Sequence, residues 1–251
     1  MAEGDTIVRA ARRIEAAIAG DAVVVSAPSP RGRAAGVERL DGLVFEGVET
    51  KGKNLLLRFG ELSLHSHLGM NGSWHAYPAG GRWAKPRRSA WAALRGERGE
   101  AVQFGGSTLR VMPTAAGRRE LARLGPDILA PGLDLEEAVA SLRAAGGRTL
   151  GDALLDQNRV AGIGNIFKSE ACFAARLDPW RRVDDLDGDE LLAVLEAARA
   201  LMQASVADGR PVRAVYKRAG RPCLACRTRV ASRGQGDANR TTYWCPSCQS
   251  G

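Results

Sequence analysis

Four cysteines near the end of the chain form two Cys-x-x-Cys pairs, and this pattern has the best-defined chemistry in the sequence. Cys223 and Cys226 make the first pair, Cys245 and Cys248 make the second, and residues 227–244 lie between them. Each pair forms a tight turn whose sulfur atoms converge, and four thiolates are preferred donors for a structural Zn²⁺. The spacing therefore predicts a structural zinc ion, with a redox or iron–sulfur centre as the weaker alternative.

The segment between the two cysteine pairs is basic. It carries Arg227, Arg229, Arg233 and Arg240 against a single acidic residue, Asp237. The whole chain has 36 Lys and Arg against 28 Asp and Glu, a net charge of +8. Such a balance suits a polyanionic partner. We interpret the segment as a basic zinc-held finger that contacts nucleic acid, with protein contacts as the alternative.

A glycine-rich junction forms a second candidate site. Residues 154–166 are predicted to join two short helices through a turn at Gly162 and Gly164, and the second helix would begin at about Asn165. Exposed amides at a helix start can bind a phosphate, and an Asn side chain adds a donor. A tight helical hairpin inside a core is the alternative.

The elements that must position these residues indicate an α+β protein with two parts. An amphipathic helix over residues 6–19, capped by Asp5 or Thr6 and ended by Gly20, precedes a β-rich region over 22–112. Helical periodicity follows a boundary near residues 124–127. The strands that we expect include 22–26, 42–48, 54–59 and 62–68, and the helices are 135–145, 149–156, 165–176 and 188–207, the last with Asp187 and Glu190 as a capping box.

The remaining candidate ligands have a structural interpretation. His65 and His67 alternate on a predicted strand, His75 falls in a predicted loop, and none of them has an acidic or Cys partner at ligand spacing. Cys172 falls in a helix and is expected in the core. No run is apolar enough to span a membrane and the first residues lack a signal-type apolar segment, so we expect a cytoplasmic, DNA-associated protein.

Several of these segments together resemble the formamidopyrimidine-DNA glycosylase and endonuclease VIII family. Residues 155–157 and 160–166 resemble its helix-two-turn-helix element, and residues 240–249 resemble the end of its zinc finger. Shorter matches are residues 3–5, 52–53, 67–72 and 124–127. The resemblance covers residues 3–249. Residues 4–6 resemble endonuclease VIII more than formamidopyrimidine-DNA glycosylase.

The resemblance implies a three-part architecture that binds damaged DNA as a monomer. It places an N-terminal helix and β-sandwich domain at residues 1–122, a helix-two-turn-helix domain at 123–208 and a zinc finger at 209–251. The damaged base is flipped out of the duplex. Met70 would fill the vacated space, and Lys53, Asn165 and Arg240 would hold the flanking phosphates.

By the same resemblance, catalysis uses the amine of residue 2, exposed when Met1 is removed, and Glu3 as general acid and base. The amine displaces the base, forms an imine with the sugar, and elimination then cuts the strand. The family has proline where this chain has Ala2. We expect a glycosylase and abasic-site lyase acting on oxidised bases, with pyrimidines favoured; the alternative is an impaired enzyme or a non-catalytic binder of damaged DNA. Residues 111–118 also lack an Arg and Phe pair that many members insert opposite the lesion. Arg118 or Arg119 could contact the orphaned base instead, but we favour a solvated surface for both.

Overall fold

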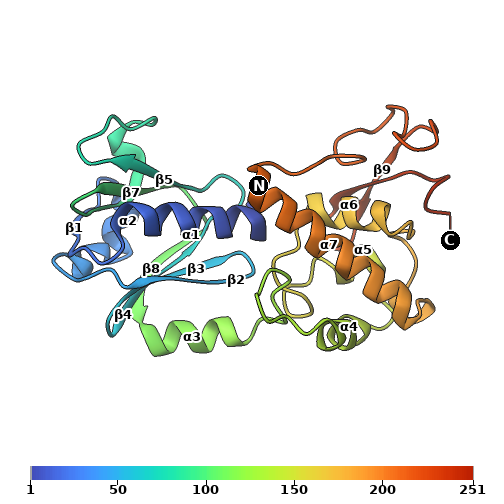
Figure 1. Ribbon diagram of the computed structural model, residues 1–251, viewed down its shortest axis with the longest axis horizontal. Helices are drawn as coiled ribbons and strands as arrows, with labels where there is room; N and C mark the ends of the chain where they lie inside the picture. Colours follow the sequence, from blue (N-terminus) through green and yellow to red (C-terminus); the bar gives the residue numbers. More distant parts are fainter. Residues whose placement is uncertain (1, 251) are drawn as a thin grey trace. The chain divides into compact units, whose positions relative to one another are not determined.

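The computed structural model describes residues 2–250, and the chain divides into two compact units between Arg123 and Leu124. The first unit holds two four-stranded antiparallel sheets and one long helix. The second holds helices and a two-stranded hairpin that carries the cysteines. Figure 1 shows both units coloured along the chain. The α+β class with an N-terminal β-sandwich and a helical second part is therefore confirmed.

The first helix, α1 (Gly4–Ile18), forms because apolar residues recur every three or four positions. Ile7, Ile14 and Ile18 are fully buried on that stripe. The helix begins earlier than predicted, and neither predicted cap residue is correct, because Glu3 occupies the N-cap position. Gly20 follows the helix with a φ of +80°, as a helix-ending glycine does.

Two antiparallel sheets make up the sandwich of the first unit. The first sheet has the strand order β1–β6–β7–β5 and the second has the order β2–β3–β4–β8. Figure 1 shows α1 between them, and its contacts with β5, β7 and β2 agree. The strands are β1 (Val24–Ser26), β2 (Gly47–Lys51), β3 (Asn54–Phe59), β4 (Leu62–His67), β5 (Ser73–Pro78), β6 (Ala90–Arg95), β7 (Gly99–Phe104) and β8 (Thr108–Pro113); short helical turns are α2 (Pro30–Ala34), η1 (Val37–Leu40) and η2 (Arg87–Ser89).

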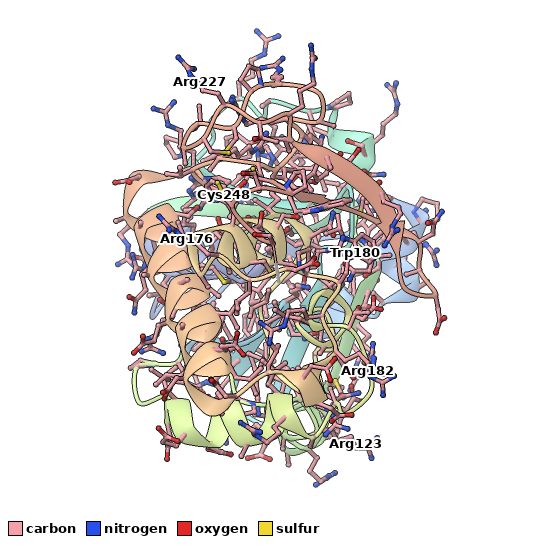
Figure 2. The ribbon with its side chains drawn as sticks, turned by 90° about the vertical axis from the view of Figure 1, so that its right-hand side faces the viewer. Arg123, Arg176, Trp180, Arg182, Arg227 and Cys248 are labelled. Carbon is pink, nitrogen blue, oxygen red and sulfur yellow. The ribbon has the colours of Figure 1, made fainter. Side chains whose placement is uncertain are left out.

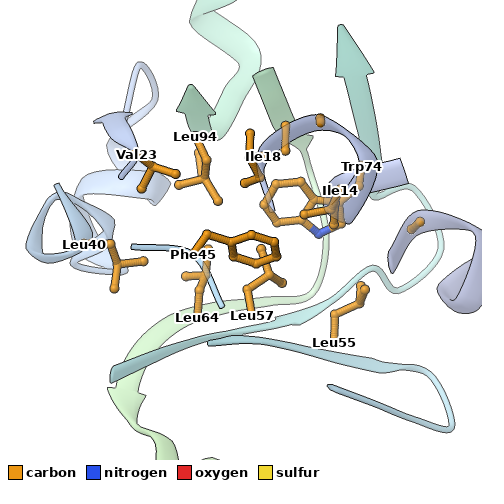
Figure 3. Close-up of a cluster of buried hydrophobic side chains, with 14 of the residues drawn as sticks. Ile14, Ile18, Val23, Leu40, Phe45, Leu55, Leu57, Leu64, Trp74 and Leu94 are labelled. Atoms are coloured by element: carbon orange, nitrogen blue, oxygen red, sulfur yellow. The ribbon is translucent and has the colours of Figure 1, made fainter. Parts of the chain in front are cut away.

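The inner faces of the sheets and α1 enclose the core of the first unit. Phe45, Leu57 and Leu64 lie there with Ile14 and Trp74 (Figure 3). Burial of such side chains stabilises the fold by about 1.5–3 kcal/mol each. This core fixes the strand ends, and the loops at those ends carry the candidate site residues.

Some predicted strands differ from the structure. The predicted strand 54–59 coincides with β3. In the predicted strand 42–48, residues 42–46 are irregular apart from an isolated bridge between Val44 and Ala22, and residues 47–48 begin β2. His75 was expected in a loop but lies in β5, paired with Val102. Residues 73–78 contain no Val, Ile or Leu, so Trp74 and Tyr77 alone indicated a strand.

The second unit contains the predicted helices with shifted ends. They are α4 (Leu135–Arg143), α5 (Leu150–Ala153), α6 (Asn165–Ala174) and α7 (Gly188–Asp208), with a turn η3 (Val183–Asp185) and a hairpin of β9 (Ala231–Gln235) and β10 (Arg240–Trp244). The capping box of Asp187 and Glu190 at α7 is present as predicted. Cys172 is fully buried in the core, also as predicted. No helix among residues 2–250 is long and apolar enough to cross a membrane.

Helix α3 (Thr114–Ala122) of the first unit was not predicted, nor was the short α2. Helix α3 follows β8 directly and is anchored by Thr114, whose hydroxyl lies 2.7 Å from the hydroxyl of Ser63. Its Gly117 packs against Leu56 in the space where a larger residue would have a side chain. Arg118 of this helix pairs with Glu49, with Nε 3.1 Å from each carboxylate oxygen. Arg118 is therefore engaged within the protein in this structure.

Candidate functional sites

The first candidate site is the loop cluster at the start of the chain. The backbone N–H of Ala2 points to the carbonyl of Gly69 at 3.5 Å. Glu3 is only 1% exposed, and its carbonyl accepts hydrogen bonds from the N–H groups of Thr6 and Ile7 at 2.9 and 3.1 Å. The backbone at Glu3 is thus fixed as the first turn of α1. The buried acidic residue Glu3 therefore directly follows Ala2, whose amine is the predicted nucleophile.

His67 connects this chain start to Lys53. Lys53 lies in the turn between β2 and β3, and its neighbour Asn54 pairs with His67 across the sheet. The ring Nδ1 of His67 lies 2.7 Å from the Ser107 hydroxyl and 3.2 Å from the N–H of Gly69. Burial lowers the pKa of His67, and the Lys53 charge lowers it further. The neutral ring therefore orders the loop that contacts Ala2.

Met70 occupies the tip of that same loop. Gly69 has a φ of +58°, and a Cβ there would lie 3.1 Å from the Ser107 side chain, so glycine is required. The N–H of Gly72 closes the turn on the carbonyl of Leu68 at 2.9 Å. Met70 itself is 57% exposed and is not a core methionine. The first unit thus gathers Ala2, Glu3, Lys53 and Met70 around one ordered loop.

The glycine-rich junction in the second unit is shaped by one glutamine. Gln157 donates from its side-chain amide to the carbonyls of Leu155 and Ile163, at 2.8 and 3.1 Å. Its side-chain oxygen accepts the N–H of Gly162 at 3.0 Å. The N–H of Gly125 in turn donates to the Gln157 carbonyl at 3.0 Å. Two of the motifs found in the sequence, at 124–127 and 155–166, therefore pack on each other.

Asn165 begins α6 in a buried setting. All of residues 160–172 are buried, as in a tight helical hairpin within a core, and the binding of a phosphate at this helix start stays a prediction. The side-chain amide of Asn165 donates to the carbonyl of Thr241 in β10 at 2.7 Å. Its Oδ1 is buried and makes no hydrogen bond within residues 2–250. The contact places Asn165 next to Arg240, the exposed first residue of β10.

A buried polar network joins α6 to the finger hairpin. Lys168 is fully buried, and its ammonium donates to the Thr242 hydroxyl at 2.5 Å. Thr242 donates to the side-chain oxygen of Gln235 at 2.5 Å. The Gln235 amide reaches the Thr149 hydroxyl at 2.9 Å and the Pro179 carbonyl at 2.8 Å. Sequence reasoning missed this network, because it joins α6 to residues more than 60 positions away.

The four paired cysteines converge as predicted. Their sulfur atoms all lie within 4.8 Å of one another. The Sγ atoms of Cys223 and Cys248 are 3.9 Å apart, and those of Cys226 and Cys245 are 3.4 Å apart. Tetrahedral metal–sulfur bonds of about 2.3 Å place sulfurs about 3.8 Å apart. In Figure 2 the sulfur atoms gather next to Cys248, with Arg227 above them. The group can hold a metal ion.

The pKa values of Cys226 and Cys248 are shifted in opposite directions. Hydrogen bonds with Thr228 lower the pKa of Cys226 to about 6. The hydrogen bond that Cys248 makes with Cys226 raises the pKa of Cys248 to about 12. One thiolate among four close sulfurs makes the others harder to ionise, because like charges repel. A bound cation would remove that repulsion and allow all four to act as thiolate ligands.

Glu170 fixes the beginning of the finger to α6. Its carboxylate accepts hydrogen bonds from the backbone N–H groups of Ala214, Val215 and Tyr216 at 2.7, 3.0 and 2.7 Å. Burial raises the pKa of Glu170, and these three amides partly offset that effect. Residues 214–216 have neither helix nor strand. The carboxylate therefore supplies the backbone partners that regular structure would otherwise provide.

Two domains of one protein family match the chain over most of its length. The formamidopyrimidine-DNA glycosylase N-terminal domain matches residues 1–107, and the formamidopyrimidine-DNA glycosylase H2TH domain matches residues 124–215. The chain belongs to the formamidopyrimidine-DNA glycosylase and endonuclease 8 family. The family expected from the sequence motifs is thus confirmed.

Similar curated proteins cover the whole chain. A probable endonuclease 8 2 of Streptomyces coelicolor is 42% identical, over 100% of this chain and 95% of that protein. A DNA-(apurinic or apyrimidinic site) lyase Nei2 of Mycolicibacterium smegmatis is 34% identical, over 100% and 99%. Among solved structures, the formamidopyrimidine-DNA glycosylase of Lactococcus lactis bound to DNA containing an abasic site has a TM-score of 0.86 and 21% identity, with 100% of each chain covered. That likeness shows the fold.

Proposed function

We propose that this protein is a base-excision-repair DNA glycosylase with abasic-site lyase activity, and that it removes oxidised bases, pyrimidines above all. The observation that carries the proposal is the loop cluster of the first unit, where the amine-bearing residue Ala2, the buried Glu3 and the exposed Met70 meet one ordered turn. Relatives named probable endonuclease 8 2 and DNA-(apurinic or apyrimidinic site) lyase Nei2, similar over the whole chain, support the lyase reaction. The preference for oxidised pyrimidines rests on the resemblance of residues 4–6 to endonuclease VIII.

The reaction would use the amine of Ala2 after Met1 is removed. A free α-amino group has a pKa near 8, so a useful fraction is neutral at physiological pH. That amine attacks the anomeric carbon of the damaged nucleotide, the carbon–base bond breaks, and the base leaves with a proton that Glu3 supplies. The sugar ring opens to an imine on Ala2. Loss of a sugar proton to Glu3 then expels the 3′ phosphate and cuts the strand.

The remaining site residues would hold DNA rather than react. Met70 would enter the stack where the base has left, since an exposed apolar side chain on a fixed loop suits that role. Lys53, Asn165 and Arg240 would bind the phosphates on either side of the lesion. Asn165 uses one amide proton on Thr241 and keeps a second for a phosphate oxygen. We assign residues 1–122 to the catalytic domain, 123–208 to the helix-two-turn-helix domain and 209–251 to the finger.

The metal in the finger would be Zn²⁺, held by Cys223, Cys226, Cys245 and Cys248. Four thiol ligands whose sulfur atoms lie within 4.8 Å of one another support this identity. Such a site is closed, so the ion would order the hairpin that carries Arg240 and would supply no step of the reaction. Binding around a single lesion is asymmetric, and we expect the protein to act as a monomer.

The deciding experiment is intact-protein mass spectrometry after incubation with abasic-site DNA and borohydride. We expect an adduct on chain that lacks Met1, and its absence from the Glu3→Gln variant. A chain with extra residues in front of Ala2 is the matched control and should give no adduct. Processed wild-type protein that binds the DNA yet forms no adduct would overturn the lyase assignment in favour of a non-catalytic binder of damaged DNA.

A further inference from the structure

The loop between β5 and β6, residues 79–89, is strongly basic. From residue 62 to residue 96 the chain contains no Asp or Glu. Within that stretch Arg82, Lys85, Arg87 and Arg88 fall in seven consecutive positions. We refer to residues 79–89 as the β5–β6 loop. It lies outside the loop cluster described above, at the opposite end of β5 from Met70.

The β5–β6 loop has a fixed shape because an aromatic side chain anchors it. Trp83 is 8% exposed and packs with Phe104 in a small apolar cluster. Its indole N–H donates to the carboxylate of Glu100 at 2.7 Å. The backbone N–H of Ala84 donates to the hydroxyl of Tyr77 at 3.1 Å. Glu100 is itself buried, so this acid is used to hold the tryptophan rather than to neutralise the surface.

The four cations of the loop are ordered or exposed without being neutralised. The Arg87 guanidinium lies 4.2 Å from the centre of the Trp83 ring. Lys85 donates to the Ser73 hydroxyl at 3.0 Å. Arg82 and Arg88 are exposed. None of the four forms an ion pair with a carboxylate of residues 2–250.

The positive charge continues beyond the loop onto α1. Helix α1 packs on β5, and its Arg13 is exposed. Burial is the main cause that lowers the pKa of His75, and the charges of Lys85 and Arg13 lower it further. Residues 80–87 also enclose an open hollow of about 580 Å³. A preformed cationic surface without acidic neighbours recruits phosphates with little loss of side-chain freedom.

We propose that the β5–β6 loop is a second contact for the DNA backbone, which binds phosphates of the duplex flanking the lesion. The proposal rests on the proposed function, which supplies the DNA. Strand β5 has six residues, about 20 Å, and this length corresponds to about six base pairs of duplex. A duplex aligned with β5 would bring phosphates roughly half a helical turn from the flipped base to this loop.

The test compares two variants of equal net charge. Arg82→Ser with Arg88→Ser removes the exposed cations of the loop and leaves the anchored Trp83 and Arg87 in place. Arg39→Ser with Arg143→Ser is the matched control, because both arginines are exposed and lie on other elements, η1 and α4. The probe is a duplex with one tetrahydrofuran abasic-site analogue and about 12 base pairs on each side, long enough to reach the loop.

In a plot of log affinity against log salt concentration, we expect the slope of the loop variant to be shallower than that of wild type by about 1.8. Each of the two lost phosphate contacts contributes about 0.9 to the slope. The affinity gap between wild type and loop variant should then shrink about 10-fold between 50 and 200 mM salt. The control should keep the wild-type slope. On a hairpin-closed duplex with about four base pairs on each side, all three proteins should bind alike, since the loop has no phosphates to contact.

A loop variant whose slope and duplex-length dependence equal those of the control would overturn the proposal. Borohydride trapping at saturating abasic-site DNA is measured in parallel and should be unchanged in the loop variant, because the reacting groups are elsewhere. If wild-type protein forms no adduct while the salt slopes differ as expected, the lyase assignment fails and the second DNA contact stands. The two failures are therefore distinguishable.

Discussion

Lys168 and Thr242 are both fully buried, and the Lys168 ammonium donates a hydrogen bond to the Thr242 hydroxyl at 2.5 Å. The two residues are 74 positions apart in sequence and join helix α6 to strand β10. A buried ammonium is costly unless hydrogen bonds compensate for the water it has lost. The position of the finger hairpin, and with it Arg240, therefore depends on this pair.

Thr242→Val should be more damaging than Lys168→Met. The valine leaves a buried charge with one fewer partner, at a cost of about 2 kcal/mol or more of unfolding free energy. The methionine removes the charge itself and should cost less than about 1 kcal/mol. The double variant should recover part of the Thr242→Val loss in urea denaturation. Thr241→Val, on the exposed face of the same strand, is the control; strictly additive effects would show that the pair is not coupled.

Removal of the metal should unfold the finger and leave the first unit folded. The four sulfur ligands come from two separate turns, and without a cation little holds these turns together. Chelation is expected to release one ion per chain and to abolish binding to damaged DNA. The measurement is metal analysis with circular dichroism and DNA binding on the same sample. One ion per chain that persists in Cys245→Ser would contradict the assigned ligand set.

Cys172→Ser is the matched control for the cysteine ligands. Burial raises the pKa of Cys172 to about 12, so its thiol stays protonated and unreactive at neutral pH. The variant should therefore retain one ion per chain. In the folded wild-type protein a thiol reagent should leave Cys172 unmodified, and peptide mapping after labelling checks this.

Met70→Ala should affect the reaction without affecting stability. Met70 is 57% exposed, so truncation leaves no cavity and should change the unfolding free energy by less than about 0.5 kcal/mol. Base release from duplex DNA should fall about 10-fold or more, because nothing then fills the space left by the flipped base. Borohydride trapping on a single-stranded abasic site should change much less. Val24→Ala, which removes another exposed apolar side chain, is the control; equal losses on both substrates would argue against a wedge.

Acid should destabilise the first unit. Burial is the main cause that lowers the pKa of His65, His67 and His75 below the ordinary value of 6.5. Because these pKa values are lower in the folded protein, the unfolded chain binds protons more readily. The contribution of the three neutral rings to the free energy of unfolding is therefore present above pH 6.5 and is lost as the pH falls towards the folded pKa values. The melting temperature should decrease over that window. NMR titration of the three rings should give midpoints below 6.5, and higher midpoints would contradict the assignment.

Sequence patterns predicted the parts of this protein whose order is local. Helix α7 with its capping box, the strand over residues 54–59 and the sulfur cluster follow from spacing within a short segment. The family followed from short motifs distributed along the chain, each with a local shape, such as the Gly69 turn. The spacing of apolar residues and the residue types of turns depend on neighbouring positions only, so they can be recognised without knowledge of distant contacts.

Contacts between distant residues could not be predicted in this way. The His67 ring was interpreted as structural, but its role in ordering the Met70 loop depends on Ser107, which lies 40 positions away. Helix α3 was missed because it packs through Gly117 on Leu56 and has few large apolar residues of its own. Asn165 begins α6 as predicted, but its side-chain hydrogen bond to Thr241 of β10, 76 positions away, could not be predicted from local spacing.

The hydrogen bonds between the Glu170 carboxylate and the N–H groups of residues 214–216 should slow the hydrogen exchange of these amides. These residues have the backbone form of a loop, and loop amides usually exchange with solvent quickly. Here the carboxylate holds all three N–H groups, so their exchange requires the opening of the packing around α6. A deuterium-labelling map of this protein will therefore show a protected segment with no helix or strand, directly before the first cysteine pair. That protection originates from the Glu170 side chain rather than from regular secondary structure.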